Sequence, residues 1–154
     1  MRKIYNYILT ACFALSATTC NAQVTVKLSQ LAGTTWKTIK PNDTKIERMW
    51  TFSSKVYKQY RIYTFDNYRK SPGVTYPFYL DSIYSFNFEH SKVGVSKKGC
   101  YIHEYNANKN YSDIWVIESF DDDKGIMTIT KKINTDAPIV IGTNTITLVL
   151  KRIQ

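Results

Sequence analysis

The side chains best suited to catalysis or metal binding are Cys100, His103, Glu104 and His90. A cysteine nucleophile needs a base within hydrogen-bonding distance. Residues three apart on a β-strand point to opposite faces, so Cys100 and His103 cannot form a dyad if they share a strand. Cys100 is therefore predicted to be a small buried apolar group. His103 and Glu104 are predicted to be ordinary strand residues.

The spacing of the potential ligands does not match a metal site. The sequence contains no HxH, HExxH or CxxC pattern. The stretch Asp121–Gly125 lacks the alternating ligands and the final glutamate of an EF-hand loop. Asp and Gly suit hairpin turns, so this stretch is predicted to be a turn. With no phosphate loop or GxSxG elbow either, the sequence predicts a non-enzymatic protein with no catalytic residue, metal or cofactor.

Residues 1–22 have the layout of a secretory signal peptide. Arg2 and Lys3 precede an apolar run that is shorter than the roughly 20 residues a membrane span requires. Cys20 and Ala22 are the small residues that cleavage after residue 22 requires. The predicted domains are thus the signal peptide and residues 23–154, exported to the periplasm or secreted, with no transmembrane segment after cleavage.

An alternative is a lipoprotein anchored through Cys20. The preceding residues fit this poorly, because Ala17 and Thr19 stand where lipoproteins usually have Leu and a small residue. Under either reading Cys12 is removed. If Cys20 also leaves with the signal peptide, Cys100 is the sole remaining cysteine, which predicts no intrachain disulfide.

The chain is basic, with 21 Lys and Arg against 12 Asp and Glu. Removing the signal peptide takes away two basic residues and lowers the net charge from +9 to +7. The remaining basic residues are scattered and no run exceeds a pair. Because a nucleic-acid site needs a basic stripe, we expect a solvated surface and no nucleic-acid partner.

Short alternating segments separated by turn residues fill residues 23–154, which are rich in Tyr, Thr, Ile and Val. A short helical turn at 25–31 precedes Gly33. Many short strands at hairpin spacing indicate a barrel or a sandwich. We predict an all-β, antiparallel, up-and-down eight-stranded barrel, with a β-sandwich as the alternative. The segments that make up roughly eight or nine predicted strands are 36–40, 45–52, 56–65, 76–81, 82–90, 92–96, 100–106, 111–120, 125–133 and 145–154.

The two ends of the domain favour the barrel. In such a barrel the first and last strands pair antiparallel. Trp36 begins the first strand, and Ile146, Leu148, Leu150 and Arg152 share one face of the last. If that face points inward, Arg152 lies at the same end as Trp36 and covers its indole by a cation–π contact.

Gly33, Trp36 and Arg152 together resemble the lipocalin family and its calycin relatives. In that family the Trp closes the barrel floor and the Arg lies across it. The chain departs from the Gly-x-Trp motif, because two residues separate Gly33 from Trp36, and no C-terminal helix is predicted. It is more similar to the compact lipocalin-like domains of exported Bacteroidetes proteins. The resemblance implies that Trp36 and Arg152 form a structural barrel floor.

The chain has 12 Tyr, 7 Phe and 3 Trp. Inward-facing aromatics could line a cavity, although tyrosine also suits both faces of a strand. For 56–65 the inner face is ambiguous, with Val56, Tyr60 and Ile62 on one side and Tyr57, Tyr63 and Phe65 on the other. The residues chosen as candidate cavity lining are Trp50, Phe52, Tyr60, Ile62 and Trp115.

Two functions follow from this reading. The first is binding of a small hydrophobic or amphipathic ligand in the barrel cavity, at the end opposite Trp36, with loops 66–73 and 134–144 around the opening. The alternative is a cell-envelope interaction protein that uses the barrel surface or loops to bind another protein or an acidic glycan.

Overall fold

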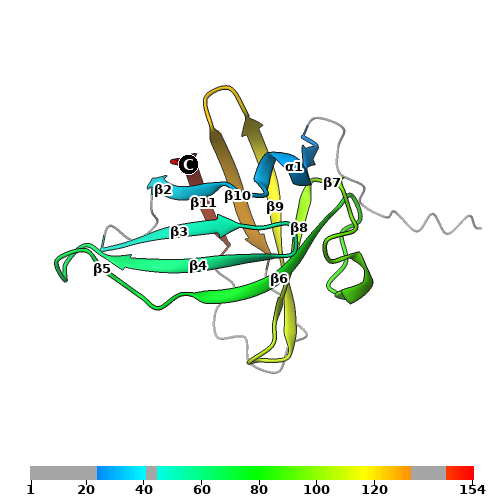
Figure 1. Cartoon of the computed structure of the whole chain (residues 1–154), viewed down its shortest axis with the longest axis horizontal. Helices are drawn as coiled ribbons and strands as arrows, with labels where there is room; N and C mark the ends of the chain where they lie inside the picture. Colours follow the sequence, from blue (N-terminus) through cyan, green and yellow to red (C-terminus); the bar gives the residue numbers. More distant parts are fainter. Residues whose placement is uncertain (1–23, 41–44, 133–144) are drawn as a thin grey trace, which may run out of the picture.

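The computed structural model describes residues 24–40, 45–132 and 145–154. Eight antiparallel strands form a closed barrel, in which every strand pairs with its neighbours in the sequence and β11 pairs with β2. The predicted up-and-down eight-stranded barrel is therefore confirmed over the sandwich (Figure 1). The barrel strands are β2 (Thr35–Lys40), β3 (Ile46–Phe52), β4 (Val56–Tyr63), β6 (Val74–Asp81), β8 (Tyr101–Asn106), β9 (Tyr111–Asp121), β10 (Ile126–Lys132) and β11 (Ile146–Arg152).

Five short elements lie outside the barrel. β5 (Arg69–Lys70) extends the edge of β4, and β1 (Val26–Lys27) pairs with β7 (Lys98–Gly99). Helix α1 (Leu28–Leu31) confirms the helical turn predicted before Gly33. The 3-10 helix η1 (His90–Lys92) lies within 82–97, where the sequence predicted two strands. That prediction is wrong, because the alternating aromatics of this segment pack against the outer wall without joining the sheet.

The barrel core is apolar because period-two alternation points one side of each strand inward. Helix α1 adds Leu28 and Leu31, both buried, at one end. The buried apolar residues that the barrel strands point inward are Trp36, Trp50, Phe52, Tyr57, Phe78, Leu80, Ile102, Trp115, Ile117, Met127, Ile129, Leu148 and Leu150. These side chains fill the part of the barrel next to α1.

Trp36 and Arg152 meet at that end. They are direct cross-strand partners on β2 and β11, and the Arg152 guanidinium lies 5.3 Å from the centre of the Trp36 ring. Trp36 is fully buried and its indole N–H donates to Thr34 Oγ1 at 2.7 Å. Arg152 also pairs with Asp122 in the β9–β10 turn at 2.7 Å. The first and last barrel strands are thus linked where α1 covers the interior, and we call this the closed end.

A second, smaller cluster of aromatics covers the outer wall of β6, β8 and β9. Tyr79 and His103 stack with their ring centres 4.7 Å apart and their planes 6° from parallel. The His103 Nε2 atom lies 3.0 Å from the carbonyl oxygen of Ile83. Burial lowers the pKa of His103, although the Ile83 carbonyl opposes the shift. His103 is therefore a stacked wall residue that faces away from the barrel interior.

Cys100 is buried beside Tyr101 and Ile114, as predicted for a small apolar group. Cys100 is disulfide-bonded in the structure of the whole chain, whereas the prediction of no disulfide applies to the chain after removal of residues 1–22 and stays a prediction. The predicted signal peptide and the lipidation candidate Cys20 lie outside the described residues. Within the described ranges, no helix is long and apolar enough to cross a membrane.

Candidate binding site

The inner face of the barrel becomes progressively exposed away from the closed end. Trp50 and Tyr57 are 1% exposed, and Trp50 pairs with Gln59 across β3 and β4. One step further, Arg48 is half-buried and its cross-strand partner Arg61 is exposed. Cross-strand partners share a face, so these residues follow the inner wall outward. We call this the open end; loop 66–73 belongs to it, whereas loop 134–144 lies outside the described residues.

Three of the five candidate cavity residues point into the barrel. Trp50 and Trp115 pack edge to face with ring centres 6.1 Å apart, and Phe52 contacts Tyr57 and Phe78. All three are buried. They form the inner wall up to the level of Trp115, where the interior is filled by side chains.

The choice of Tyr60 and Ile62 as cavity lining is wrong. Tyr60 pairs with Met49 and Ile62 with Glu47, on the face opposite Trp50. The Tyr60 ring also lies under the ammonium of Lys70, 3.8 Å from the ring centre, on the outside of the barrel. Tyr57 takes the inner position instead, because the turn after Phe52 places these two residues opposite each other.

Above Trp115 the inner wall changes from apolar to charged. Glu104 and Asp113 are cross-strand partners on β8 and β9, and each is 2% exposed. The Lys131 ammonium lies 2.9 Å from Glu104 Oε1 and 2.7 Å from Asp113 Oδ2. Lys131 comes from β10, and its side chain is 19% exposed. We call these three residues the lumen cluster.

Two aromatic residues complete the bonding of Glu104. The Tyr57 hydroxyl and the Trp115 indole N–H, at 2.8 Å, both donate to Glu104 Oε2. Burial raises the pKa of Glu104, and the charge of Lys131 opposes this. Burial lowers the pKa of Lys131, but the charges of Glu104 and Asp113 outweigh it and raise that pKa above its usual value. Glu104 thus has donors on both oxygens.

Asp113 is bonded on one side only. Its Oδ2 meets Lys131, whereas Oδ1 is buried and has no hydrogen-bond partner among the described residues. A buried polar atom left unsatisfied costs about 1–3 kcal/mol, and more when it is charged. Oδ1 is therefore a vacant acceptor on the inner wall of the open end.

The lumen cluster is better suited to binding than to metal or nucleophilic chemistry. Within the described ranges, no three His, Cys, Asp or Glu side chains converge as metal ligands. His90 and His103 lie on the outer wall, where both contact aromatic rings. In the predicted turn, Lys124 pairs with Asp121 at 2.7 Å, so the acidic stretch closes a hairpin. The strand position of His103 and the hairpin turn at Asp121–Gly125 agree with the roles predicted for them.

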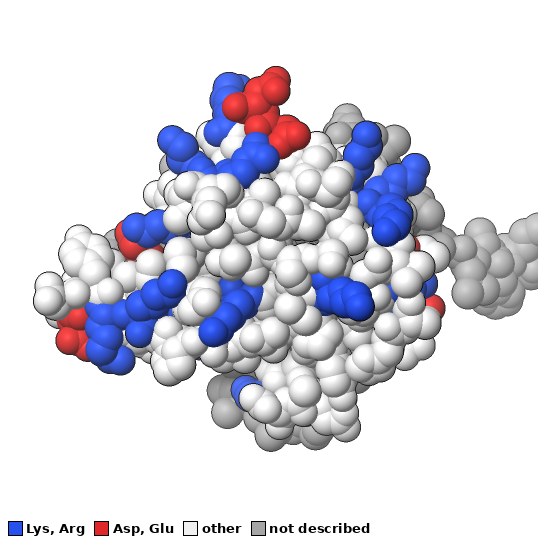
Figure 2. All heavy atoms as spheres, viewed as in Figure 1, with Lys and Arg blue, Asp and Glu red and all other residues white. Residues whose placement is uncertain are grey.

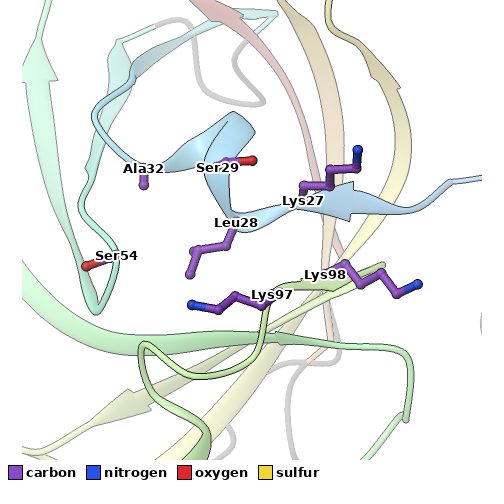
Figure 3. A pocket seen from close by; sticks show the side chains of 7 residues that line it. All are labelled: Lys27, Leu28, Ser29, Ala32, Ser54, Lys97 and Lys98. Atoms are coloured by element: carbon purple, nitrogen blue, oxygen red, sulfur yellow. The ribbon is translucent and has the colours of Figure 1, made fainter.

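A separate pocket of about 430 Å³ lies outside the barrel at the closed end. Leu28 points into it from α1, and Ser54 borders it from the β3–β4 turn (Figure 3). Three lysines surround it, Lys27 from β1 and Lys97 and Lys98 at β7, and all three are exposed. The pocket combines an apolar floor with a cationic rim.

Elsewhere the basic side chains occupy separate groups on the visible face (Figure 2). Many pair locally, as Arg69 does with Asp66 in the loop before β5. Others lie over aromatic rings, such as Arg69 over Tyr63, at 4.7 Å from the ring centre. This distribution resembles a solvated surface more than a stripe that follows a polyanion.

No protein-family model, curated protein or solved structure matches the chain. Asp113 and Lys131 were not anticipated from the sequence, and Tyr57 was named only as part of the alternative inner face of 56–65. One signal could have found Lys131, which shares its strand parity with the buried Met127 and Ile129 and so had to point inward.

Proposed function

We propose that this is an exported, non-enzymatic protein of lipocalin-like design that binds a small hydrophobic or amphipathic molecule at the open end of its barrel. The observation that carries the proposal is the gradient along the inner wall. Side chains near Trp36 are fully buried, whereas the inward positions on β3 and β4 reach solvent at the opposite end. A ligand that enters there reaches Trp115, Trp50 and Tyr57, which are closed to solvent and must part to admit its apolar chain.

The aromatic wall and the lumen cluster support an amphipathic ligand in particular. Binding sites of this kind are mainly apolar, with a few polar groups that orient the ligand. Here Trp115 supplies apolar ring surface and donates its N–H to Glu104 at 2.8 Å. The apolar wall and the polar groups therefore meet at one level of the barrel.

Mass spectrometry of the protein purified from its native host tests this proposal. We expect a co-purifying amphipathic molecule that is lost in the variant Gln59→Trp, since Gln59 lies beside Trp50 on the inner wall. The matched control is Lys58→Trp, one residue away on the outer face, where the native partner is Thr51. If both variants retain the molecule equally, or no ligand is found and none can be loaded, the proposal is wrong.

The lysine-rimmed pocket favours a second candidate function. A cell-envelope interaction protein could use Lys27, Lys97 and Lys98 to bind an anionic partner, such as an acidic glycan or an acidic segment of a protein. Capture from an envelope extract should then weaken as salt is raised and be lost in the double variant Lys97→Glu, Lys98→Glu. Gln59→Trp should leave this capture unchanged, which separates the two functions.

A further inference from the structure

Among the polar side-chain atoms of the lumen cluster, one has no hydrogen-bond partner within the described residues, and that atom is an acceptor. Tyr57 and Trp115 each have one polar hydrogen, and both hydrogens go to Glu104 Oε2. Lys131 directs its ammonium to Glu104 and Asp113. That acceptor is Asp113 Oδ1, which has no hydrogen-bond partner among the described residues. Asp113 is only 2% exposed. A carboxylate oxygen can only accept a hydrogen bond.

The charges in the cluster point the same way. Two carboxylates face one ammonium group, so the ionised cluster itself has an excess of negative charge, while Arg48 and Arg61 lie further out on the same inner wall. Its aromatic wall also suits a cation, because the Lys131 ammonium already lies 5.3 Å from the centre of the Trp115 ring. A third anion placed beside these two carboxylates would have no hydrogen to donate to Asp113 Oδ1.

We propose that the open end selects an amphipathic ligand whose polar group is a hydrogen-bond donor, a primary ammonium in preference to a hydroxyl, which donates to Asp113 Oδ1. The inference rests on the proposed function and names the chemical class of its ligand. Ligands with an ionised carboxylate as their polar group should bind more weakly, because they have no hydrogen to donate to Asp113 Oδ1.

Three ten-carbon probes that differ only in the polar group test the selection: decylamine, 1-decanol and decanoate. Their dissociation constants for the full chain at neutral pH, measured by tryptophan fluorescence, should rank decylamine tightest and decanoate weakest. The protein carries a net charge of +9, which attracts decanoate and repels decylamine. The net charge alone would favour decanoate. If the protein still binds decylamine at least tenfold more tightly, the preference must come from the local site.

The variant Asp113→Asn keeps the size of the side chain and removes the acceptor-only oxygen. We expect it to reduce the amine-to-decanoate preference at least tenfold. The matched control is Asp121→Asn at the β9–β10 turn at the closed end, which removes the same charge beside Lys124 and leaves the inner wall intact. This control should keep the wild-type preference. If Asp113→Asn fails to fold, the ranking of the three probes on the wild-type protein still decides.

The outcomes separate the inference from the function on which it rests. Equal affinities for the three probes, or decanoate binding tightest, would overturn the donor inference, as would an unchanged preference in Asp113→Asn. If the probes bind equally and Gln59→Trp abolishes their binding, the open-end function stands without donor selection. If none of the probes binds, both are overturned.

Discussion

Glu104 and Asp113 lie opposite each other on neighbouring strands inside the barrel, and the single ammonium group of Lys131 is ion-paired with both. Buried ion pairs seldom add much net stability, because the charges lose their hydration. A buried ion pair does hold its side chains in fixed positions when most of the hydrogen bonds of its charged groups are formed. Here it orients the Asp113 carboxylate with Oδ1 vacant.

Lys131→Met should destabilise the protein strongly. The substitution leaves two buried carboxylates without their shared cation, and breaking a buried pair costs about 3–5 kcal/mol. The free energy of unfolding in urea measures this. Lys132→Met is the control, because Lys132 follows on the same strand and faces outward by strand parity. Equal losses in the two variants would contradict the account of the cluster.

The stability of the protein should fall as the pH drops from 7 to 5, in part through His103. Burial lowers the pKa of His103 in the folded state. The unfolded chain binds a proton as the pH passes below about 6.5, while the folded protein resists it. The stabilisation is therefore present above this range and is lost as the pH falls towards the folded pKa.

His103→Gln removes that titration. Its urea-derived unfolding free energy should decline less than that of the wild type between pH 7 and pH 5. Parallel declines in the two proteins would show that His103 is not buried in its neutral form against Tyr79.

Trp36→Ala should cost about 3–5 kcal/mol of stability, since it empties a fully buried site between β2 and α1. Trp36→Phe should cost less and leave affinity for an open-end ligand unchanged. Thermal unfolding and probe titration check the two parts. If Trp36→Phe weakens ligand binding while the protein stays folded, the ligand binds at the closed end and the open-end site is wrong.

Gly99→Ala should disrupt the contact between β7 and β6. A Cβ atom at this position would lie 2.3 Å from the backbone nitrogen and oxygen of Asp81, which cannot give way as a side chain can. We expect a clear loss of stability and of protection from proteolysis in 82–97. Lys98→Ala, on the neighbouring exposed residue, is the control. A Gly99→Ala protein as stable as this control would contradict the close approach.

The closed end could be predicted from the sequence because few residues determine it. The parity of Leu148, Leu150 and Arg152 sends all three inward, and antiparallel closure then brings Arg152 to Trp36. The inner face of β4 could not be chosen this way, since tyrosines occupy both of its faces. The register after Phe52 decides it, by placing Tyr57 inside and Tyr60 outside.

The lumen cluster depends on contacts between distant parts of the chain. Glu104 and Lys131 lie on strands that do not pair with each other, and they meet only across the curved wall of the barrel. A polar residue in a single alternating strand indicates an outward position unless its partners are known. Segment 82–97 was mistaken for strands for a related reason, since Phe86 and Phe88 pack on the outer wall instead of forming a ladder.

The indole N–H signals of the three tryptophans in an NMR titration with decylamine test the central claim most directly. Trp115 donates to Glu104 in the lumen cluster, whereas Trp36 donates to Thr34 at the closed end. Each signal can be assigned with a Trp→Phe variant. Binding at the open end predicts a saturable shift of the Trp115 signal, a smaller shift for Trp50 and no shift for Trp36. A Trp115 signal that stays in place throughout, or a shift largest at Trp36, would contradict it.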